Sequence, residues 1–247
     1  MLYGLRGWIG KLLPRGPFFC NLCGYQGTIW LWRGHDNQAI RKYQIIGAGR
    51  RKCDCFACGS SDRDRLVYEF LKNEISDFSC MKILHVAPER QLNKKLTSLG
   101  AKMINIDARK SGYKFAYGSE TITADLTCLP FESETFDWVI ANHVLEHIVD
   151  EKRALSEIKR VLKPQGKAIL MIPYSPILSS RIEGELNWTK YQRNELLGQH
   201  DHVRLYGLDF LESWRETFEV VKLIDVRSPQ ELIVLNGEKI ILVEKQQ

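Results

Sequence analysis

Four cysteines near the amino terminus are spaced as two pairs that could together bind one metal ion. Cys20 and Cys23 form the first C-x₂-C pair, and Cys55 and Cys58 form the second. A C-x₂-C turn presents two thiolates to one side of an ion, and four thiolates complete the tetrahedral shell of structural zinc. Each pair is followed by a glycine, which permits the tight turn. We therefore predict a structural zinc site, with Cys53 as an alternative to Cys55 at a less suitable C-x₄-C spacing.

We do not expect these cysteines to form disulfides, which persist mainly in exported proteins. Arg6 and Lys11 interrupt the first apolar run, and no cleavage site of small residues follows it, so we expect no export signal. No apolar run approaches membrane-spanning length, and we expect a cytoplasmic protein. Residues 1–16 could form a short basic helix that packs against the chain itself, with weak contact to a membrane surface as the alternative.

Acidic residues and histidines recur farther along the chain, just after short apolar segments. Asp107 follows one such segment, and a carboxylate at the end of a parallel strand can accept hydrogen bonds from both hydroxyls of a ribose. Residues 143–147 read HVLEH and match the zinc-peptidase pattern H-x-x-E-H. We set the peptidase interpretation aside because this motif begins at the end of a predicted strand, whereas a peptidase carries both histidines on one helix.

Alternating strands and helices must position these side chains. Phe136–Ala141 is an apolar run typical of a strand buried on both faces. Asp150 opens a helix whose apolar residues recur three and four apart until Pro164, and 167–172 is the next strand. A strand–helix–strand unit of this length predicts a parallel sheet in an α/β fold. Ligands of such sheets bind at the carboxyl ends of the strands.

The remaining pattern extends this unit in both directions. Further strands are predicted at 28–32, 81–86, 102–106, 121–125, 218–226 and 239–243, and further helices at 62–75, 92–99 and 209–217. The segment 174–199 is long, irregular and rich in aromatic and charged residues, so we expect it to cover the ligand site as a lid. We expect residues 1–61 to form the zinc module and 62–247 the main domain, with the helix at 62–75 joining them.

The motifs of the main domain occur in a characteristic order. They are Asp125-Leu126, Leu129-Pro130-Phe131, Phe136-Asp137, Val144-Leu145-Glu146-His147 and Arg160-Val161-Leu162-Lys163-Pro164. This series resembles the class I S-adenosylmethionine-dependent methyltransferases, and most of all their small-molecule group called type 11. The resemblance is strong over residues 82–175. It implies a Rossmann-like, seven-stranded sheet behind a small N-terminal zinc-binding module, with S-adenosylmethionine as the cofactor.

The resemblance also implies where the cofactor lies. Asp125 would lie at the edge of the adenine, with Leu126 against the ring. The loop after the first strand is usually rich in glycine, but here it contains none, and Glu89 could bind the amino group of the cofactor. The predicted cofactor-binding residues are His85, Ala87, Pro88, Glu89, Asp107, Ala108, Asp125, Leu126, Asn142 and His143.

A polar cluster at 200–206 is the predicted acceptor site. Methyl transfer to a hydroxyl requires a base, and imidazoles titrate near neutral pH. We predict that His147 and His202 are catalytic and that His200, Arg204 and Tyr206 bind the substrate. The alternative is a surface turn that caps the helix after it.

The composition, with 44% hydrophobic and 26% charged residues, is typical of a globular protein and excludes a disordered chain. Residues 1–80 hold 12 Lys/Arg and 7 Asp/Glu, whereas residues 81–247 hold 23 of each. A basic appendage favours an anionic partner.

We predict that the methyl group is transferred to an oxygen or nitrogen of a small-molecule or saccharide acceptor. The alternatives are RNA, as for ribosomal RNA methyltransferases that carry a zinc module, and a non-catalytic zinc-dependent interaction protein with a degenerate methyltransferase domain.

Overall fold

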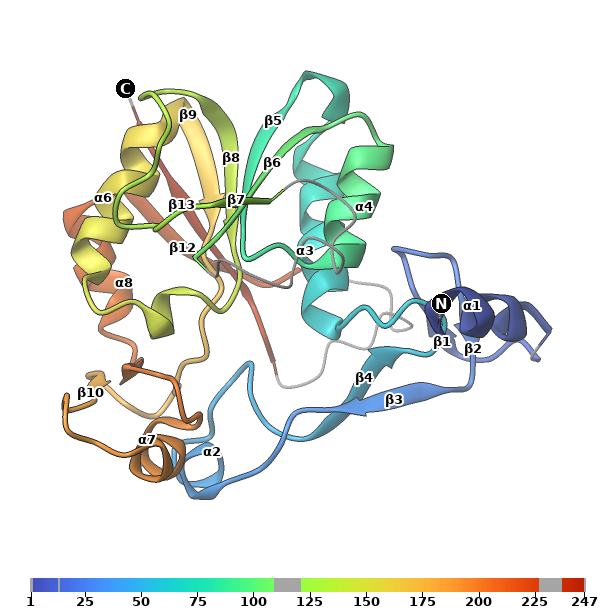
Figure 1. Cartoon of the computed structure of the whole chain (residues 1–247), viewed down its shortest axis with the longest axis horizontal. Coiled ribbons are helices and arrows are strands. Elements are labelled where there is room, and N and C mark those ends of the chain that lie inside the picture. Colours follow the sequence, from blue (N-terminus) through green and yellow to red (C-terminus); the bar gives the residue numbers. More distant parts are fainter. Residues whose placement is uncertain (1, 13, 109–120, 227–236, 247) are drawn as a thin grey trace.

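A seven-stranded sheet forms the centre of the molecule (Figure 1). The computed structural model describes residues 2–12, 14–108, 121–226 and 237–246, of which 2–5 and 11 are described as backbone only. The strand order is β12-β13-β9-β8-β5-β6-β7. The strands are β5 (Lys82–Val86), β6 (Lys102–Asp107), β7 (Thr121–Thr123), β8 (Phe136–Ala141), β9 (Leu162–Ile169), β12 (Val220–Ile224) and β13 (Ile240–Glu244). Strand β13 runs antiparallel to both its neighbours, and the other pairs are parallel. This order confirms the predicted Rossmann-like, seven-stranded sheet.

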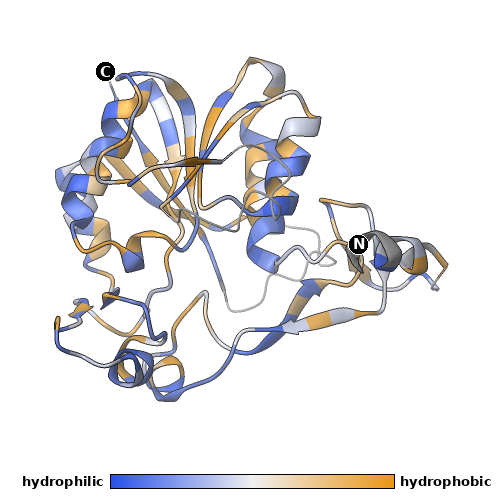
Figure 2. Ribbon diagram, viewed as in Figure 1, coloured by the Kyte–Doolittle hydropathy of each residue, from blue (hydrophilic) through white to orange (hydrophobic). Residues whose placement is uncertain are grey.

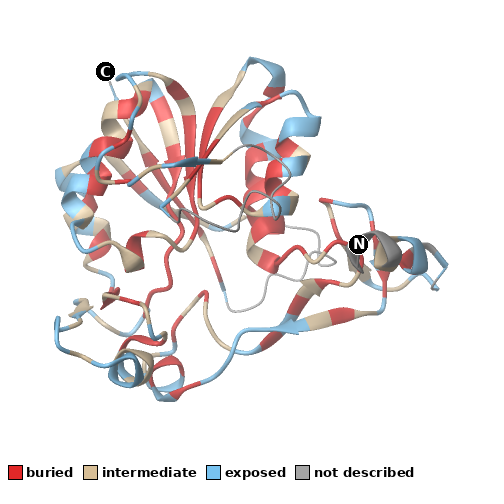
Figure 3. Cartoon of the chain, viewed as in Figure 1, coloured by how far each residue is buried: buried red, intermediate tan, exposed pale blue. Residues whose placement is uncertain are grey.

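Helices cover both faces of this sheet (Figure 1). The helices α3 (Asp62–Glu74) and α4 (Arg90–Ser98) lie on one face, and α6 (Glu151–Val161) and α8 (Phe210–Ser213) lie on the other. Because side chains alternate along a strand, β8 contributes Trp138 to the core beneath α3 and α4, and Val139 to the core beneath α6. Figure 2 shows apolar residues along the strands and on the helix faces turned toward them, and Figure 3 shows these same regions buried.

Strand β9 begins earlier than the sequence predicts. We expected Pro164, Gln165 and Gly166 to separate a helix from a strand starting at 167, but β9 already starts at Leu162. Its register against β8 shifts after the Phe136–Leu162 pair, and Gln165 has a φ of 63°. The turn-forming residues therefore make an irregularity within one strand, which also ends at Ile169, three residues before the predicted end.

Residues 2–55 contain a short helix and two small antiparallel ribbons of two strands each. Strands β1 (Phe18–Phe19) and β2 (Gln26–Gly27) form one, and β3 (Trp30–Arg33) and β4 (Arg51–Cys55) form the other. Helix α1 (Leu2–Leu12) lies against the first ribbon, because a Cβ on Gly10 would be 3.1 Å from the ring of Tyr25. On the same helix, Trp8 and Leu12 are exposed. Within the described ranges, no helix combines the length and the apolar character needed to cross a bilayer.

Two buried arginines join the second ribbon to the main domain. Arg51, on β4, forms a bidentate ion pair with Asp62 at the start of α3, with N–O distances of 2.6 and 3.1 Å. The guanidinium of Arg65 lies 3.9 Å from the ring centroid of Trp30 and donates hydrogen bonds to the carbonyl oxygens of Cys53 and Ser60. The ribbon thus packs as part of the main domain.

A separate layer covers the carboxyl ends of the parallel strands. It consists of α2 (Gln38–Lys42), β10 (Ile182–Glu183), α7 (Lys190–Leu197) and β11 (Arg204–Leu205). Helices α2 and α7 lie side by side although about 150 residues separate them (Figure 1), and Asn37 donates hydrogen bonds to the carbonyl oxygens of Asn194 and Gly198. The expectation that 174–199 is irregular is therefore wrong in its second half. Helix α7 starts with a capping box between Thr189 and Gln192, a local signal that could have predicted it.

Candidate functional site

A cavity of about 630 Å³ opens at the carboxyl ends of β5, β6 and β8, within the size range of small-molecule and cofactor pockets. We call it the larger cavity. Six of the predicted cofactor-binding residues line it, namely Ala87, Asp107, Ala108, Asp125, Leu126 and His143. They come from the ends of different strands, and the parallel sheet brings them to one edge.

The loop after β5 takes a sharp turn without glycine. Ala87 has a φ of 47°, in the left-handed region that glycine usually occupies. Its backbone N–H donates to the carbonyl oxygen of Ile106 at 2.8 Å, which ties the loop to β6. The chain can therefore approach a ligand closely here even though the expected glycines are missing.

The two aspartates of the larger cavity differ in their surroundings. Asp107 ends β6 and is half-buried. Asp125 is exposed, and its Oδ1 accepts hydrogen bonds of 2.8 Å from the backbone N–H and the hydroxyl of Thr127. This local turn fixes the orientation of the Asp125 carboxylate beside Leu126, which is buried.

Four predicted cofactor-binding residues do not line the larger cavity. They are His85, Pro88, Glu89 and Asn142. His85 is fully buried, and its Nε2 lies 2.7 Å from Oε2 of Glu89. Burial alone would raise the pKa of Glu89, but the hydrogen bond and charge of His85 hold that pKa below its ordinary value. The carboxylate that we expected to bind the cofactor therefore pairs with a histidine of strand β5.

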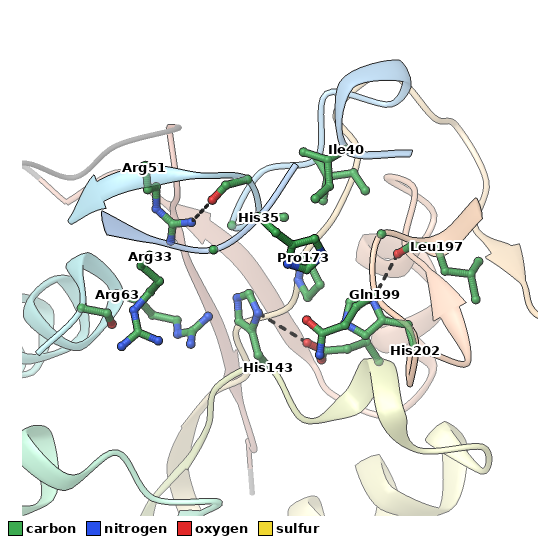
Figure 4. A pocket seen from close by; sticks show the side chains of 18 of the residues that line it. Arg33, His35, Ile40, Arg51, Arg63, His143, Pro173, Leu197, Gln199 and His202 are labelled. Carbon is green, nitrogen blue, oxygen red and sulfur yellow. Dashed lines mark hydrogen bonds and ion pairs between the residues drawn. The ribbon is translucent and has the colours of Figure 1, made fainter. Parts of the chain in front are cut away.

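A smaller cavity of about 320 Å³ adjoins the larger one, because His143 and His147 line both. Its walls come from residues 33–51, from the start of α3, and from the segment 197–202 (Figure 4). The sequence did not predict that residues 34–50 contribute to a site. These residues lie between the two cysteine pairs, and no motif marks them.

Two arginines give the smaller cavity a positive wall. Figure 4 shows the guanidinium groups of Arg33 and Arg63 on the same side of the cavity, close to the His143 ring. Arg33 pairs with Asp54. In the described part of the chain, the guanidinium of Arg63 forms neither a hydrogen bond nor an ion pair, and its Nε is buried. An unpaired guanidinium beside a cavity indicates a binding site for an anionic group.

His143 lies between two buried glutamates. Its Nδ1 is 3.5 Å from Oε1 of Glu146, and its Nε2 is 3.5 Å from Oε1 of Glu238. Burial, together with the charge of Arg63, holds the pKa of His143 well below its ordinary value. Burial raises the pKa of Glu146 to about 8 and that of Glu238 to about 7. His143 also has a φ of 53°, an unusual conformation of the kind that clusters at functional sites.

The structure brings His147 and His202 together, with ring centroids 5.0 Å apart. Nδ1 of His147 lies 3.2 Å from the carbonyl oxygen of Asp201, and Nδ1 of His202 lies 3.1 Å from that of Leu197. Burial lowers the pKa of His202 to about 4, so this imidazole is neutral near pH 7.

The three predicted substrate-binding residues line neither cavity. The buried guanidinium of Arg204 donates hydrogen bonds to the carbonyl oxygens of Leu145, Ile148 and Val149, and pairs with Glu183. The hydroxyl of Tyr206, also buried, donates to Glu151 at 2.7 Å. His200 is exposed. The polar segment was expected to face an acceptor, but its arginine and tyrosine are used inside the fold.

The four predicted zinc ligands lie within 4.8 Å of one another. The Sγ atoms of Cys20 and Cys58 are 3.8 Å apart, and those of Cys23 and Cys55 are 3.7 Å apart. Four sulfurs at about 2.3 Å from one zinc ion lie about 3.8 Å apart in a regular tetrahedron, whereas a disulfide requires about 2.05 Å. Cys53 is buried outside this cluster.

Comparisons with known proteins agree with this architecture. Residues 88–170 match the type 11 family described as a methyltransferase domain. A Pyrococcus horikoshii protein, PH0226, has a similar fold, with a TM-score of 0.51 and 17% identity over 75% of this chain and 90% of that one. The Bacillus subtilis YcgJ protein also has a similar fold, with a TM-score of 0.50 and 16% identity over 72% of this chain and 97% of that one. Residues 88–170 therefore carry a methyltransferase domain.

Curated relatives match a minor part of the chain. The ubiquinone/menaquinone biosynthesis C-methyltransferase UbiE of Francisella tularensis subsp. novicida is 30% identical over 84 residues, which are 34% of this chain and 34% of that protein. The chain therefore matches about a third of the length of this relative. The methyltransferase domain alone does not specify a reaction, because the [4+2]-cyclase SpnF shares the fold with a TM-score of 0.50 and 16% identity over 74% of this chain and 81% of that one.

Proposed function

We propose that the chain transfers a methyl group from S-adenosylmethionine to an acceptor, with the cofactor in the larger cavity and the acceptor in the smaller one. The observation that carries this proposal is that the two cavities meet at His143 and His147. In-line transfer requires donor and acceptor atoms to be held in contact and aligned. A junction of two cavities at the carboxyl edge of the sheet meets that requirement.

The residues of the larger cavity fit S-adenosylmethionine, which supplies an electrophilic methyl group. Asp107, at the end of β6, would accept hydrogen bonds from the ribose hydroxyls. Asp125 and the buried Leu126 would bind the adenine at its edge and face. The left-handed turn at Ala87 would let the backbone approach the methionine part, whereas Glu89 pairs with His85 and does not line this cavity.

The acceptor would enter the smaller cavity with an anionic group toward Arg33 and Arg63. This charge favours a small molecule or saccharide that carries a phosphate or carboxylate, methylated on oxygen or nitrogen. UbiE is named a C-methyltransferase, so a carbon atom of the acceptor is the alternative. The proton that the acceptor loses would pass to one of the three imidazoles at the junction, which belong to His143, His147 and His202.

An RNA acceptor is the second candidate, and one surface observation favours it. Trp32 on β3 is 56% exposed, with the cationic groups of Arg50 and Lys52 at 5.0 and 5.4 Å from its ring. Exposed aromatic rings flanked by cations stack on unpaired bases. Affinity for RNA that falls steeply with salt would favour this candidate, because phosphate contacts release counterions.

We also propose that Cys20, Cys23, Cys55 and Cys58 bind one structural zinc ion. The sulfur–sulfur distances of 3.7 and 3.8 Å support tetrahedral thiolate coordination. With four protein ligands the ion has no open position, so its role would be to hold β2, β4 and the loops beside them together.

Isothermal titration calorimetry with S-adenosylmethionine tests the cofactor site. Wild type should bind one equivalent, and Asp107→Ala should lose at least about tenfold in affinity, because a charged hydrogen bond contributes about 1.5–3 kcal/mol. Asp225→Ala, an exposed aspartate after β12, is the matched control. Transfer of radiolabelled methyl groups to anionic acceptors would then identify the substrate. A folded wild type that does not bind the cofactor would leave the non-catalytic interpretation.

A further inference from the structure

Three potential metal ligands meet beside the junction of the two cavities, far in sequence from the cysteine cluster. Glu146 and His147 belong to the 3₁₀ turn η2 (Leu145–His147), and His202 comes from the segment after α7. One ligand atom from each side chain lies within 4.8 Å of the other two. Within the described chain, they form a group of imidazoles and carboxylate separate from the thiolates.

Both imidazoles are oriented as metal ligands usually are. Nδ1 of His147 lies 3.2 Å from the carbonyl oxygen of Asp201, and Nδ1 of His202 lies 3.1 Å from that of Leu197. A carbonyl oxygen only accepts hydrogen bonds, so each Nδ1 must carry the proton. In its neutral form, each ring therefore has its lone pair on Nε2. Histidines that bind metals typically donate the other ring N–H to a backbone carbonyl in this way.

The carboxylate of Glu146 lacks the partners that burial normally demands. Its side chain is fully buried, and neither carboxylate oxygen forms a hydrogen bond in the described part of the chain. Nε2 of His147 lies 4.0 Å from its Oε1, too far for a hydrogen bond. Buried polar groups without partners are rare because they lose their hydration without replacement. A cation between these ligands would satisfy the carboxylate.

We propose that Glu146, His147 and His202 bind one divalent transition-metal ion. Two imidazoles and one carboxylate favour ions such as Zn²⁺, Fe²⁺, Mn²⁺ or Co²⁺ over Ca²⁺ and Mg²⁺, which prefer all-oxygen sites. Three protein ligands leave coordination positions open. Because Glu146, His147 and His202 all line the smaller cavity, the open positions face the space proposed for the acceptor.

The role of the ion, unlike its binding, rests on the proposed methyl transfer. An ion at this place would bind an oxygen of the acceptor and make a hydroxyl there easier to deprotonate. A histidine whose Nε2 binds a metal cannot also take a proton, so His147 and His202 would be ligands and not bases. His143, which lines both cavities, is the imidazole at the junction that would remain free of the ion.

Titration of the full-length protein with Co²⁺ tests the site directly. Metal analysis first counts the zinc in each variant, so that the thiolate cluster is known to be filled. Co²⁺ should then bind at one further equivalent and give visible ligand-field absorption without a thiolate-to-metal charge-transfer band. Two zinc ions per wild-type chain, one of them missing in Glu146→Gln, would support the site equally.

Glu146→Gln and His202→Gln should each weaken Co²⁺ binding by at least about 100-fold, because even partners outside the ligand shell cost 10–100-fold. Glu185→Gln and His200→Gln are matched controls, because both side chains are exposed and neither lines the smaller cavity. Glu146→Gln keeps the shape of the side chain, and thermal unfolding confirms that each variant is folded. The proposal is overturned if wild type that holds a single zinc ion binds no Co²⁺, or if both variants bind it like their controls.

Calorimetry with S-adenosylmethionine on the same proteins separates this proposal from the proposed function. Metal binding without cofactor binding would keep the site and remove its role in methyl transfer. Cofactor binding and methyl transfer without a second metal would keep the function and overturn the site.

Discussion

The guanidinium of Arg204 donates a hydrogen bond of 2.6 Å to the carbonyl oxygen of Ile148. It also donates to the carbonyl oxygens of Leu145 and Val149, at 3.1 and 2.9 Å. The carbonyl of Leu145 lies in η2, the turn that carries two of the proposed metal ligands, and those of Ile148 and Val149 follow it directly. Arg204 is thus a positioning residue that holds this turn against β11.

Arg204→Met should lower the free energy of unfolding by about 2–4 kcal/mol, because it leaves buried carbonyls without donors while keeping an apolar stem. Urea denaturation measures this change. Arg215→Met removes an arginine that is half exposed and that, in the described part of the chain, pairs with Glu212 alone, so this control should lose no more than about 0.5 kcal/mol. Equal losses in the two variants would mean that the Arg204 contacts do not stabilise the fold.

The unpaired guanidinium of Arg63 predicts that anions stabilise the protein. A ligand that binds only the folded state raises stability as its concentration exceeds its dissociation constant. Phosphate should therefore raise the Tm of wild type at constant ionic strength, and this rise should shrink in Arg63→Gln. The matched control is Arg215→Gln, which should respond to phosphate like wild type. A rise that persists in full in Arg63→Gln would mean that the anion binds elsewhere.

Loss of one cluster cysteine should release the structural zinc. Cys23→Ser should contain one zinc ion fewer per chain than wild type, and limited proteolysis should cut it within residues 14–58, where the four thiolates cross-link the loops. Cys128→Ser, an exposed cysteine outside the cluster, should keep the wild-type zinc content. Thiolate-bound metal that remains in a Cys20→Ser/Cys55→Ser double variant would contradict the assignment.

The left-handed conformation of Ala87 predicts that glycine stabilises this position. A non-glycine residue in this conformation destabilises the folded state by about 1–2 kcal/mol. Glycine avoids this strain, but its greater flexibility in the unfolded chain destabilises the folded state by about 0.5–1 kcal/mol. Ala87→Gly should therefore raise the free energy of unfolding by about 0.5–1 kcal/mol in thermal or urea unfolding. Ala124→Gly, at a residue without positive φ, should lower it. A less stable Ala87→Gly would show that the alanine methyl makes contacts that outweigh the strain.

The repeating units of the fold could be predicted from short stretches of sequence. The apolar run at Phe136–Ala141 predicted β8 with its observed bounds, and the spacing after Asp150 predicted α6. The position of Asp107 after an apolar segment and the family resemblance at Asp125 predicted that both belong to the cofactor site, and both line the larger cavity. The two C-x₂-C pairs likewise predicted a cluster whose sulfurs the structure brings together. The strand, the helix and each single C-x₂-C pair depend on neighbours within a few residues, which a local pattern records.

Only the tertiary structure decided what faces the smaller cavity. Arg33 and Arg63 lie beside His143 because β3 and the start of α3 are held together through the buried pair of Arg51 and Asp62. Arg204 looked like a substrate ligand in the sequence, but it faces inward, where three carbonyl oxygens need donors. Whether a polar side chain binds a ligand or satisfies its own fold depends on which groups the rest of the chain leaves unpaired beside it. Those groups come from segments far apart in sequence, so composition and spacing cannot specify them.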